Sequence, residues 1–357
     1  MADQDGRWAS LPLDLLAKVF ARLLELAPAD KSLPRAAACR AWWLAFRGET
    51  KTLTVARAGT VALAGVSRMG SLTDLEVSCN TLPVDWWECV SGLRRLRRLS
   101  ICPCPPGLWR LRRLPELSAL DISWSDGGDA SVAGLRRIRG LTHLSLSGTR
   151  VTPKGLRQLR SMRLRTLEAA ANGIAELGWM RPVGALLTRL DLGRNPIGDA
   201  GAALAVECCP VLTSLSVDSC LIGCPGAQAI ASLRELRALD ISANFVQDAG
   251  GVALAACTSL ESLHASTNWL GEASAVALSR LPRLRDVELD DNLVTLAGAR
   301  ALVAMPAVRR LLLWHNPIHC VYALLEECPA GLVLQVSSFR GAGILTTGRS
   351  PGAGVDS

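Results

Sequence analysis

A leucine pattern that returns every 21–25 residues limits what this chain can fold into more than any other feature of the sequence. Its template is L-x-x-L-x-L-x-x-N, with Cys, Thr or Ser also found at the ninth position. A fixed period of roughly 20–50 residues is the signature of a repeat architecture, in which a unit buries its apolar face only by stacking on its neighbours. Eleven copies begin at Leu72, Leu96, Leu117, Leu141, Leu164, Leu187, Leu212, Leu236, Leu260, Leu284 and Val308.

The spacing inside the template predicts the structure of each unit. Residues at positions 4 and 6 alternate as in a β-strand and point to one side, whereas positions 3, 5 and 7 point to the other. The ninth residue turns the chain, and an Asn there can bond backbone groups of a neighbouring unit that would otherwise be buried unpaired. Gly- and Ala-rich stretches after it predict short helices. With degenerate copies at 53–55 and 332–336, we expect an α/β solenoid over residues 50–336, with strands on a concave side and helices on a convex side.

These units are identified as leucine-rich repeats, a family that folds as a horseshoe-shaped solenoid. Several units continue with a G-A-x-A-L-like segment, and Asp199 and Asp248 stand just before such segments, where a helix start favours an acid. Over roughly residues 141–305 the chain resembles the GALA-type repeat proteins, type III effectors of plant pathogens. The clearest copies are Gly226–Ile230, Gly250–Leu254 and Gly298–Leu302.

Residues 8–47 do not fit the repeat and predict two short helices. The run Leu11-Pro12-Leu13-Asp14 opens the first, because Pro near the first position and an acid in the first turn are typical of helix starts. An apolar stripe follows at Leu16, Val19, Phe20 and Leu23. Two such helices are too small for a stable core of their own, so they must pack on something else. One interpretation is a helical cap that shields the first strand of the solenoid.

The same segment resembles an F-box, whose pattern is L-P-x-D/E-L-L, then [IV]-[FL], then C-R-x-W. Residues 11–16, 19–20 and 39–42 match it. The resemblance implies that the segment docks the Skp-family adaptor of a cullin-based ubiquitin ligase, while the repeats hold the substrate. The implied adaptor-binding residues are Leu11, Pro12, Leu15, Leu16, Val19, Phe20 and Trp42. The chain would then be a substrate receptor, either a bacterial effector in plant cells or a plant-like F-box protein. The alternative is an intracellular leucine-rich-repeat scaffold unconnected to ubiquitin.

Charge and composition favour a protein partner over nucleic acid or membrane. The net charge is +7, but residues 51–165 hold 19 Lys/Arg against 8 Asp/Glu, and residues 166–357 hold 13 against 18. The arginines of the basic part come in pairs without interleaved aromatics, which favours a solvated face over a nucleic-acid surface. No apolar run reaches the roughly 18 residues of a membrane span, and the first residues do not read as a secretory signal. Twelve Cys then indicate reduced thiols in the cytoplasm or nucleus, of a host cell if the protein is an effector.

Catalytic constellations are not found in the sequence. The four His come without a Ser/His/Asp order, and no phosphate-binding loop is present. Cys102 with Cys104, and Cys208 with Cys209, have no second ligand pair at zinc-finger spacing. We therefore expect a protein that is not an enzyme and holds no metal or cofactor.

The concave face is where we expect a substrate protein to bind. Position 5 is acidic in six of eleven units and basic in none, which predicts a basic partner segment, although Asp is also a common consensus residue there. We expect the substrate site near the C-terminal end of the array, at His264, Trp269, Glu288, Asp290, Asp291, Trp314 and His315. Exposed Trp beside charge is typical of binding hot spots, although the two Trp could instead seal the core. Residues 337–357 are expected to form a disordered tail.

Overall fold

The computed structural model describes residues 51–56, 66, 69–78, 82, 86–138, 140–338 and 341–346. The chain divides into two compact units, unit 1 (residues 1–166) and unit 2 (residues 167–357). The F-box-like segment at 8–47 lies outside the described residues, so the helices expected there stay a prediction.

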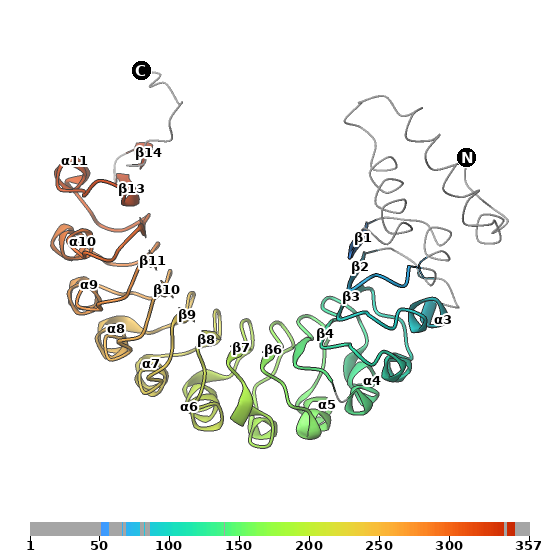
Figure 1. Cartoon of the computed structure of the whole chain (residues 1–357). Coiled ribbons are helices and arrows are strands. Elements are labelled where there is room, and N and C mark those ends of the chain that lie inside the picture. The colour runs from blue at the N-terminus through green and yellow to red at the C-terminus, as the bar shows by residue number, and fades with distance from the viewer. Residues whose placement is uncertain are drawn as a thin grey trace, which may run out of the picture. The chain divides into compact units, whose positions relative to one another are not determined.

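In unit 1, the described strands are parallel, and each pairs with the next in chain order (Figure 1). They are β1 (Thr52–Ala56), β2 (Asp74–Ser78), β3 (Arg98–Cys102), β4 (Ala119–Asp121) and β5 (His143–Ser145). Short α-helices and 3-10 helices connect them: α3 (Trp86–Ser91), η4 (Leu108–Arg113), α4 (Gly128–Ala133), η5 (Leu135–Arg137), α5 (Pro153–Leu156) and η6 (Arg157–Ser161). The degenerate copy at 53–55 is thus part of a strand, as expected.

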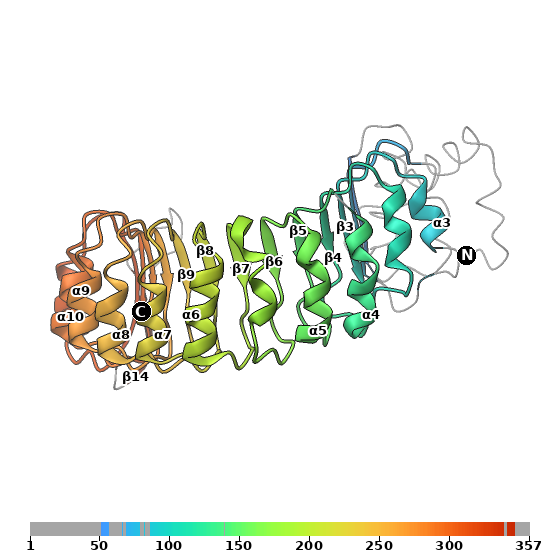
Figure 2. The ribbon, with the colours of Figure 1, turned by 90° about the horizontal axis from the view of Figure 1, so that it is seen from below.

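Unit 2 repeats this plan with longer helices. After β6 (Thr166–Glu168) at the boundary, its strands are β7 (Arg189–Asp191), β8 (Ser214–Ser216), β9 (Ala238–Asp240), β10 (Ser262–His264), β11 (Asp286–Glu288), β12 (Arg310–Leu313), β13 (Val333–Ser338) and β14 (Gly341–Thr346). Its helices are η7 (Gly178–Met180), η8 (Gly184–Leu186), α6 (Gly198–Cys208), α7 (Cys224–Ile230), α8 (Gln247–Leu254), α9 (Glu272–Leu278), α10 (Leu296–Val303) and α11 (Val321–Glu326). Within this unit the strands lie on one side and helices α6–α11 on the other, and α6–α10 run side by side (Figures 1 and 2).

The leucines of the template stand in register across the strands and form the core. Leu215, Leu239 and Leu263, all at position 4, are direct partners on β8, β9 and β10. Each is at most 2% exposed. The expected inward direction of position 4 is therefore confirmed in unit 2.

The C-terminal segment differs from its prediction. We expected residues 337–357 to be a disordered tail, but β13 continues to Ser338, and β14 pairs with it antiparallel, with Val336 opposite Leu345. The last parallel strand would otherwise present a row of unpaired N–H and C=O groups, and a returning strand satisfies them. Residues 347–357 lie outside the part of the chain that the structure describes.

Asparagines at position 9 join consecutive repeats. In Asn244, Oδ1 accepts hydrogen bonds from the backbone N–H groups of Cys220 (3.0 Å) and Ile222 (2.9 Å), and Nδ2 donates to the Val217 carbonyl at 2.8 Å. Cys220 occupies the same position with a thiol that donates to the Leu192 carbonyl at 3.1 Å. The buried members of this ladder in unit 2 are Asn195, Asn244, Asn268, Asn292 and Asn316. The expected role of the ninth residue is confirmed in unit 2.

The acids at the helix starts act on the neighbouring repeat. Asp199 lies in the first turn of α6, as expected, but its Oδ1 accepts from the backbone N–H groups of Gly223 (2.7 Å) and Gly226 (2.9 Å) at the start of α7. Asp248 of α8 does the same for α9. A Cβ on Gly226 would lie 2.6 Å from Asp199 Oδ1, so this glycine allows the close approach that brings the carboxylate to the next helix.

Candidate functional site

The strand side of unit 2 carries an excess of carboxylates. In each repeat, positions 3, 5 and 7 point away from the leucine core. Position 8 follows in a left-handed backbone conformation, with φ between 51° and 58° in the seven repeats from Ala171 to His315. We call the acids at these positions the acidic face: Glu168, Asp191, Asp218, Asp240, Asp286, Glu288, Asp290 and Asp291. Three arginines, Arg189, Arg194 and Arg310, share the same positions.

The Arg310 guanidinium already pairs with two acids at the C-terminal end of the acidic face. Arg310 Nη1 lies 3.1 Å from Asp286 Oδ1 and 2.5 Å from Glu288 Oε1, and His264 Nδ1 lies 3.8 Å from Glu288 Oε2. His264, Asp286 and Glu288 bring ligand atoms within 4.8 Å of one another, as a metal site would. The Arg310 guanidinium, however, already supplies a cation to both carboxylates, so their geometry needs no metal ion.

The adjacent turn joins four of the residues expected at the substrate site. His315 Nδ1 lies 2.9 Å from Asp291 Oδ1, and both residues occupy position 8 of successive repeats. Asp290 Oδ1 accepts from the backbone N–H of Trp314 at 2.7 Å, and the half-buried Trp314 indole Nε1 donates to Gln335 Oε1 at 3.3 Å. Burial raises the pKa of the Asp290 carboxyl, and repulsion from its acidic neighbours adds to this, against the opposing hydrogen bond from Trp314.

Trp269 lies on a different part of the surface. Its ring is 52% exposed and packs on Phe245, with ring centroids 5.6 Å apart. Both residues stand at position 10, just after the Asn of the ladder, and Leu221 and Leu293 occupy that position in the flanking repeats at 56% and 55% exposure. We call Leu221, Phe245, Trp269 and Leu293 the apolar edge. The sequence analysis singled out Trp269 but missed the edge, although the 24-residue offsets place all four at one position.

The middle of the acidic face is less neutralised than its C-terminal end. Within the described residues, Glu168, Asp191 and Asp240 make no ion pair, and Asp218 has Arg194 at 3.6 Å. Burial raises the pKa of the Asp191 carboxyl, and repulsion from Asp218 and Glu168 contributes, while a hydrogen bond from the Gly193 N–H opposes it. The sequence analysis did not single out Asp218, although its position 7 puts it beside the position-5 acids.

Buried thiols do not add reactive chemistry to this surface. Burial raises the pKa of Cys209 and Cys220 to about 12, and burial together with Cys102 raises that of Cys104 to about 12. These thiols stay protonated at neutral pH, whereas a nucleophile or a metal ligand needs the thiolate.

Comparison with known proteins supports the repeat architecture. The leucine-rich repeat family matches residues 185–204 and 233–255. The chain contains leucine-rich repeats. Its fold is similar to that of an internalin, InlF, from Listeria monocytogenes, at 18% identity and a TM-score of 0.58, covering 88% of this chain and 93% of that one. A second Listeria monocytogenes internalin, InlC2, gives 21% identity, 64% and 83% coverage and a TM-score of 0.39.

A curated relative matches a smaller part of the leucine-rich-repeat chain. The Tonsoku-like protein of Bos taurus is 35% identical over 135 residues, which are 37% of this chain and only 9% of that protein. No helix in the described ranges is both long and apolar enough to span a membrane. The family match and the structural likeness therefore both support the repeat fold of this chain.

Proposed function

We propose that this leucine-rich-repeat protein is a substrate receptor of a Skp–cullin–F-box ubiquitin ligase. Its repeats hold a substrate protein through a basic segment on the acidic face, and its F-box-like segment docks the adaptor. Ubiquitin transfer then takes place on other subunits, inside the cell that holds the ligase. The two halves of the proposal have separate support and separate tests.

The single observation that carries substrate binding is the unneutralised middle of the acidic face. Burial raises the pKa of the Asp191 carboxyl, and repulsion from neighbouring carboxylates adds to this, so a cationic partner segment would relieve a repulsion that the free protein carries. Like charges on one face also steer an oppositely charged partner and select against an acidic one. The apolar edge adds aromatic anchors, because exposed Trp and Phe side chains bury large areas on binding.

Adaptor docking is supported by the sequence of residues 8–47. The full L-P-x-D and C-R-x-W signatures are present, at Leu11–Asp14 and Cys39–Trp42, and a plain helical cap has no need of them. The apolar stripe that contains Val19 and Phe20 is the surface offered to the adaptor. The GALA-type segments favour a bacterial effector as the origin, whereas the F-box-like signature fits a plant-like protein equally well.

Co-purification of the full chain with a Skp-family adaptor tests whether the F-box-like segment docks the adaptor. Burial of one large apolar side chain is worth roughly 1.5–3 kcal/mol, so Leu11→Ala with Pro12→Ala should weaken adaptor binding at least about tenfold. The control is Asp3→Ala with Gln4→Ala, just upstream of the pattern. Full adaptor binding by the Leu11/Pro12 variant would contradict the F-box assignment. The alternative, a leucine-rich-repeat scaffold unconnected to ubiquitin, would then be favoured.

Titration with a fluorescent mixed Lys/Arg peptide tests whether the acidic face binds a basic segment. Asp191→Asn with Asp240→Asn should weaken peptide binding and reduce its salt dependence, because two unpaired carboxylates of the face lose their charge. Glu235→Gln with Glu326→Gln is the matched control, since it removes two exposed charges outside the acidic face. An equal loss in both variants would mean that the peptide responds only to total charge.

A further inference from the structure

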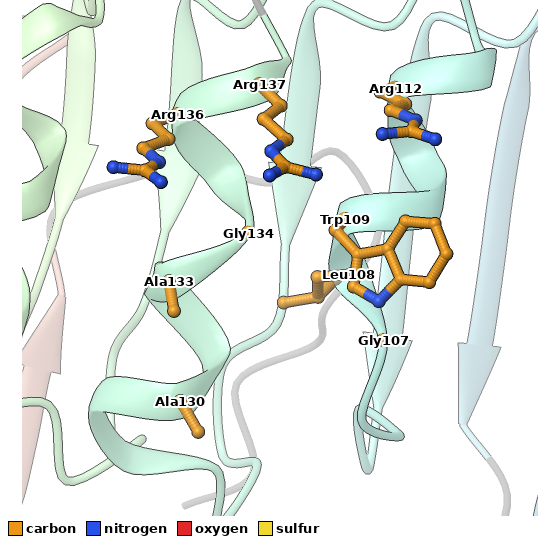
Figure 3. A pocket seen from close by; sticks show the side chains of 9 residues that line it. All are labelled: Gly107, Leu108, Trp109, Arg112, Ala130, Ala133, Gly134, Arg136 and Arg137. Atoms are coloured by element: carbon orange, nitrogen blue, oxygen red, sulfur yellow. The ribbon is translucent and has the colours of Figure 1, made fainter.

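Unit 1 holds an open cavity of about 420 Å³ on its helical side, between η4 and the α4–η5 segment. Figure 3 shows Trp109 on the η4 side, Ala130 and Ala133 on the α4 side, and three arginines at one end. The arginines that line it are Arg112, Arg136 and Arg137. The cavity lies in the unit without the acidic face and is independent of the proposed function.

Close packing of small residues builds this cavity. A Cβ on Gly134 would lie 2.7 Å from the Trp109 backbone nitrogen, so the absence of a side chain at Gly134 lets η4 approach the end of α4. Ala130 and Ala133 are short and exposed, and they leave the space in front of α4 open. The Trp109 ring, 40% exposed, and the buried Leu108 supply an apolar wall.

The arginines of the cavity carry charge that nearby carboxylates do not neutralise. Glu88 pairs with Arg110 at 3.2 Å and with Arg113 at 3.6 Å. Arg112 lies instead with its guanidinium carbon 5.2 Å from the centroid of the Trp109 ring.

Arg136 and Arg137 end η5, where the negative end of a helix favours cations. Among the residues that the structure describes, Arg112, Arg136 and Arg137 form no ion pair. Three unpaired guanidinium groups thus line one hollow.

The sequence analysis interpreted these arginine pairs as a solvated face because no aromatic residue is interleaved between them. In the structure Arg136 and Arg137 are exposed, as expected, and they line one cavity with Trp109 of the preceding repeat. We infer that this cavity binds a phosphorylated side chain of a protein partner. A phosphate monoester carries close to two negative charges and three acceptor oxygens at neutral pH, which suits several planar guanidinium groups.

The shape of the site favours a phosphorylated side chain over nucleic acid. Surfaces that bind single strands combine a long basic groove with several aromatic side chains on which successive bases stack. Here the hollow is confined between two helical segments, and Trp109 is its single aromatic lining residue. A volume of about 420 Å³ is suited to one phosphorylated side chain with its immediate flanks.

Retention of a peptide library on the immobilised full chain tests the inference. One pool carries a central phosphoserine with degenerate flanks, and the matched pool carries serine. We expect the phosphorylated pool to be retained at least about tenfold better than the serine pool. A factor of this size corresponds to one hydrogen bond to a charged group, which the serine pool cannot form with the arginines. Arg136→Ala with Arg137→Ala should abolish the preference, and Ala133→Leu should reduce it by filling the cavity without a change of charge.

The matched control is Arg94→Ala with Arg95→Ala, two exposed arginines of unit 1 that do not line the cavity. This control should keep the preference for phosphoserine, and its melting midpoint should match that of the Arg136/Arg137 variant. Equal retention of the two pools, or an equal loss in the control, would overturn the inference. Competition by a single-stranded oligonucleotide but not by a phosphoserine peptide would overturn it in favour of nucleic acid.

Discussion

The side-chain oxygen of Asn292 accepts a hydrogen bond from the backbone N–H of Asn268 at 3.0 Å. The Asn292 amide group in turn donates to the Ala265 carbonyl at 2.9 Å. One side chain therefore satisfies a donor and an acceptor of the preceding repeat, in a position where water does not reach them. This relationship links the stability of each repeat to that of its neighbour.

Replacement of a ladder asparagine should destabilise unit 2 strongly. Asn268→Ala removes the acceptor of the Val246 N–H (3.3 Å) and the donor to the Ile241 carbonyl (2.9 Å). Each of the two buried groups left unpaired costs about 1–3 kcal/mol, so we expect a loss of about 2–6 kcal/mol in the free energy of unfolding. Denaturant melts measure it, with the exposed Thr258→Ala as control. Equal midpoints for the two variants would contradict the role of the ladder.

Leu239→Ala should show the cost of a cavity in the leucine core. Leu239 is 2% exposed and stands in register with leucines on both neighbouring strands, so its truncation should cost about 2–5 kcal/mol. Leu221→Ala, at a leucine that is 56% exposed, is the matched control and should cost much less. Thermal or denaturant melts that leave the Leu239→Ala midpoint unchanged would mean that the template register is wrong.

The two Trp of the expected substrate site should behave differently on truncation. Trp269→Ala removes a ring that is 52% exposed and packs on Phe245, so its melting midpoint should change little. Trp314→Ala removes a half-buried ring and its hydrogen bond to Gln335, and its midpoint should fall further. If the order is reversed, Trp269 has a structural role and is not available as an anchor. A hot-spot Trp should cost at least about 2 kcal/mol in partner affinity when truncated.

The pH dependence of stability should reveal the cost of burying the Asp191 carboxylate beside other acids. The folded state raises the pKa of Asp191 above the ordinary value of 3.8, so it holds this proton more tightly than the unfolded chain does. Stability is therefore lost as the pH rises from 3.8 through the folded-state pKa. Asp191→Asn keeps the oxygen that accepts from the Gly193 N–H at 2.9 Å but carries no charge. We expect the variant to be more stable than the unsubstituted chain at pH 7, with no advantage below the ordinary pKa.

Asp248 provides the control of opposite sign. Burial tends to raise the pKa of its carboxyl, but hydrogen bonds from Ser274 and Gly271 outweigh this and lower the pKa below 3.8. Its stabilising contribution is present above 3.8 and is lost as the pH falls through the folded-state pKa. Asp248→Asn should therefore lower stability at pH 7. Urea melts across this pH range that show the same sign for both variants would contradict the assignment.

Sequence reasoning succeeded where a property depends on position within the repeat. Two features could be predicted in this way: the inward direction of leucines such as Leu239, and the asparagines that bond the preceding repeat. The first follows from the alternation of side chains along a strand, and the second from the nearly constant length of the repeat. Residues 337–338 and 341–346 are strands where a disordered tail was expected, because their pairing depends on the open edge of β13 and not on a repeat. The role of Asp199 was only half predicted, since its place in the first turn is local but its hydrogen-bond donors belong to the next helix.

The repeat, its strand register and the acidic character of position 5 follow from the amino-acid sequence alone, because the covalent period places equivalent residues on neighbouring strands. Which of those charges remain unneutralised depends on contacts between side chains of different repeats. Arg310 reaches Asp286 and Glu288 while Asp191 is left with acidic neighbours, and Trp109 lines one cavity together with arginines of another repeat. The length of each side chain and its solvent exposure decide these contacts. The spacing of a repeat in the sequence gives no information about either.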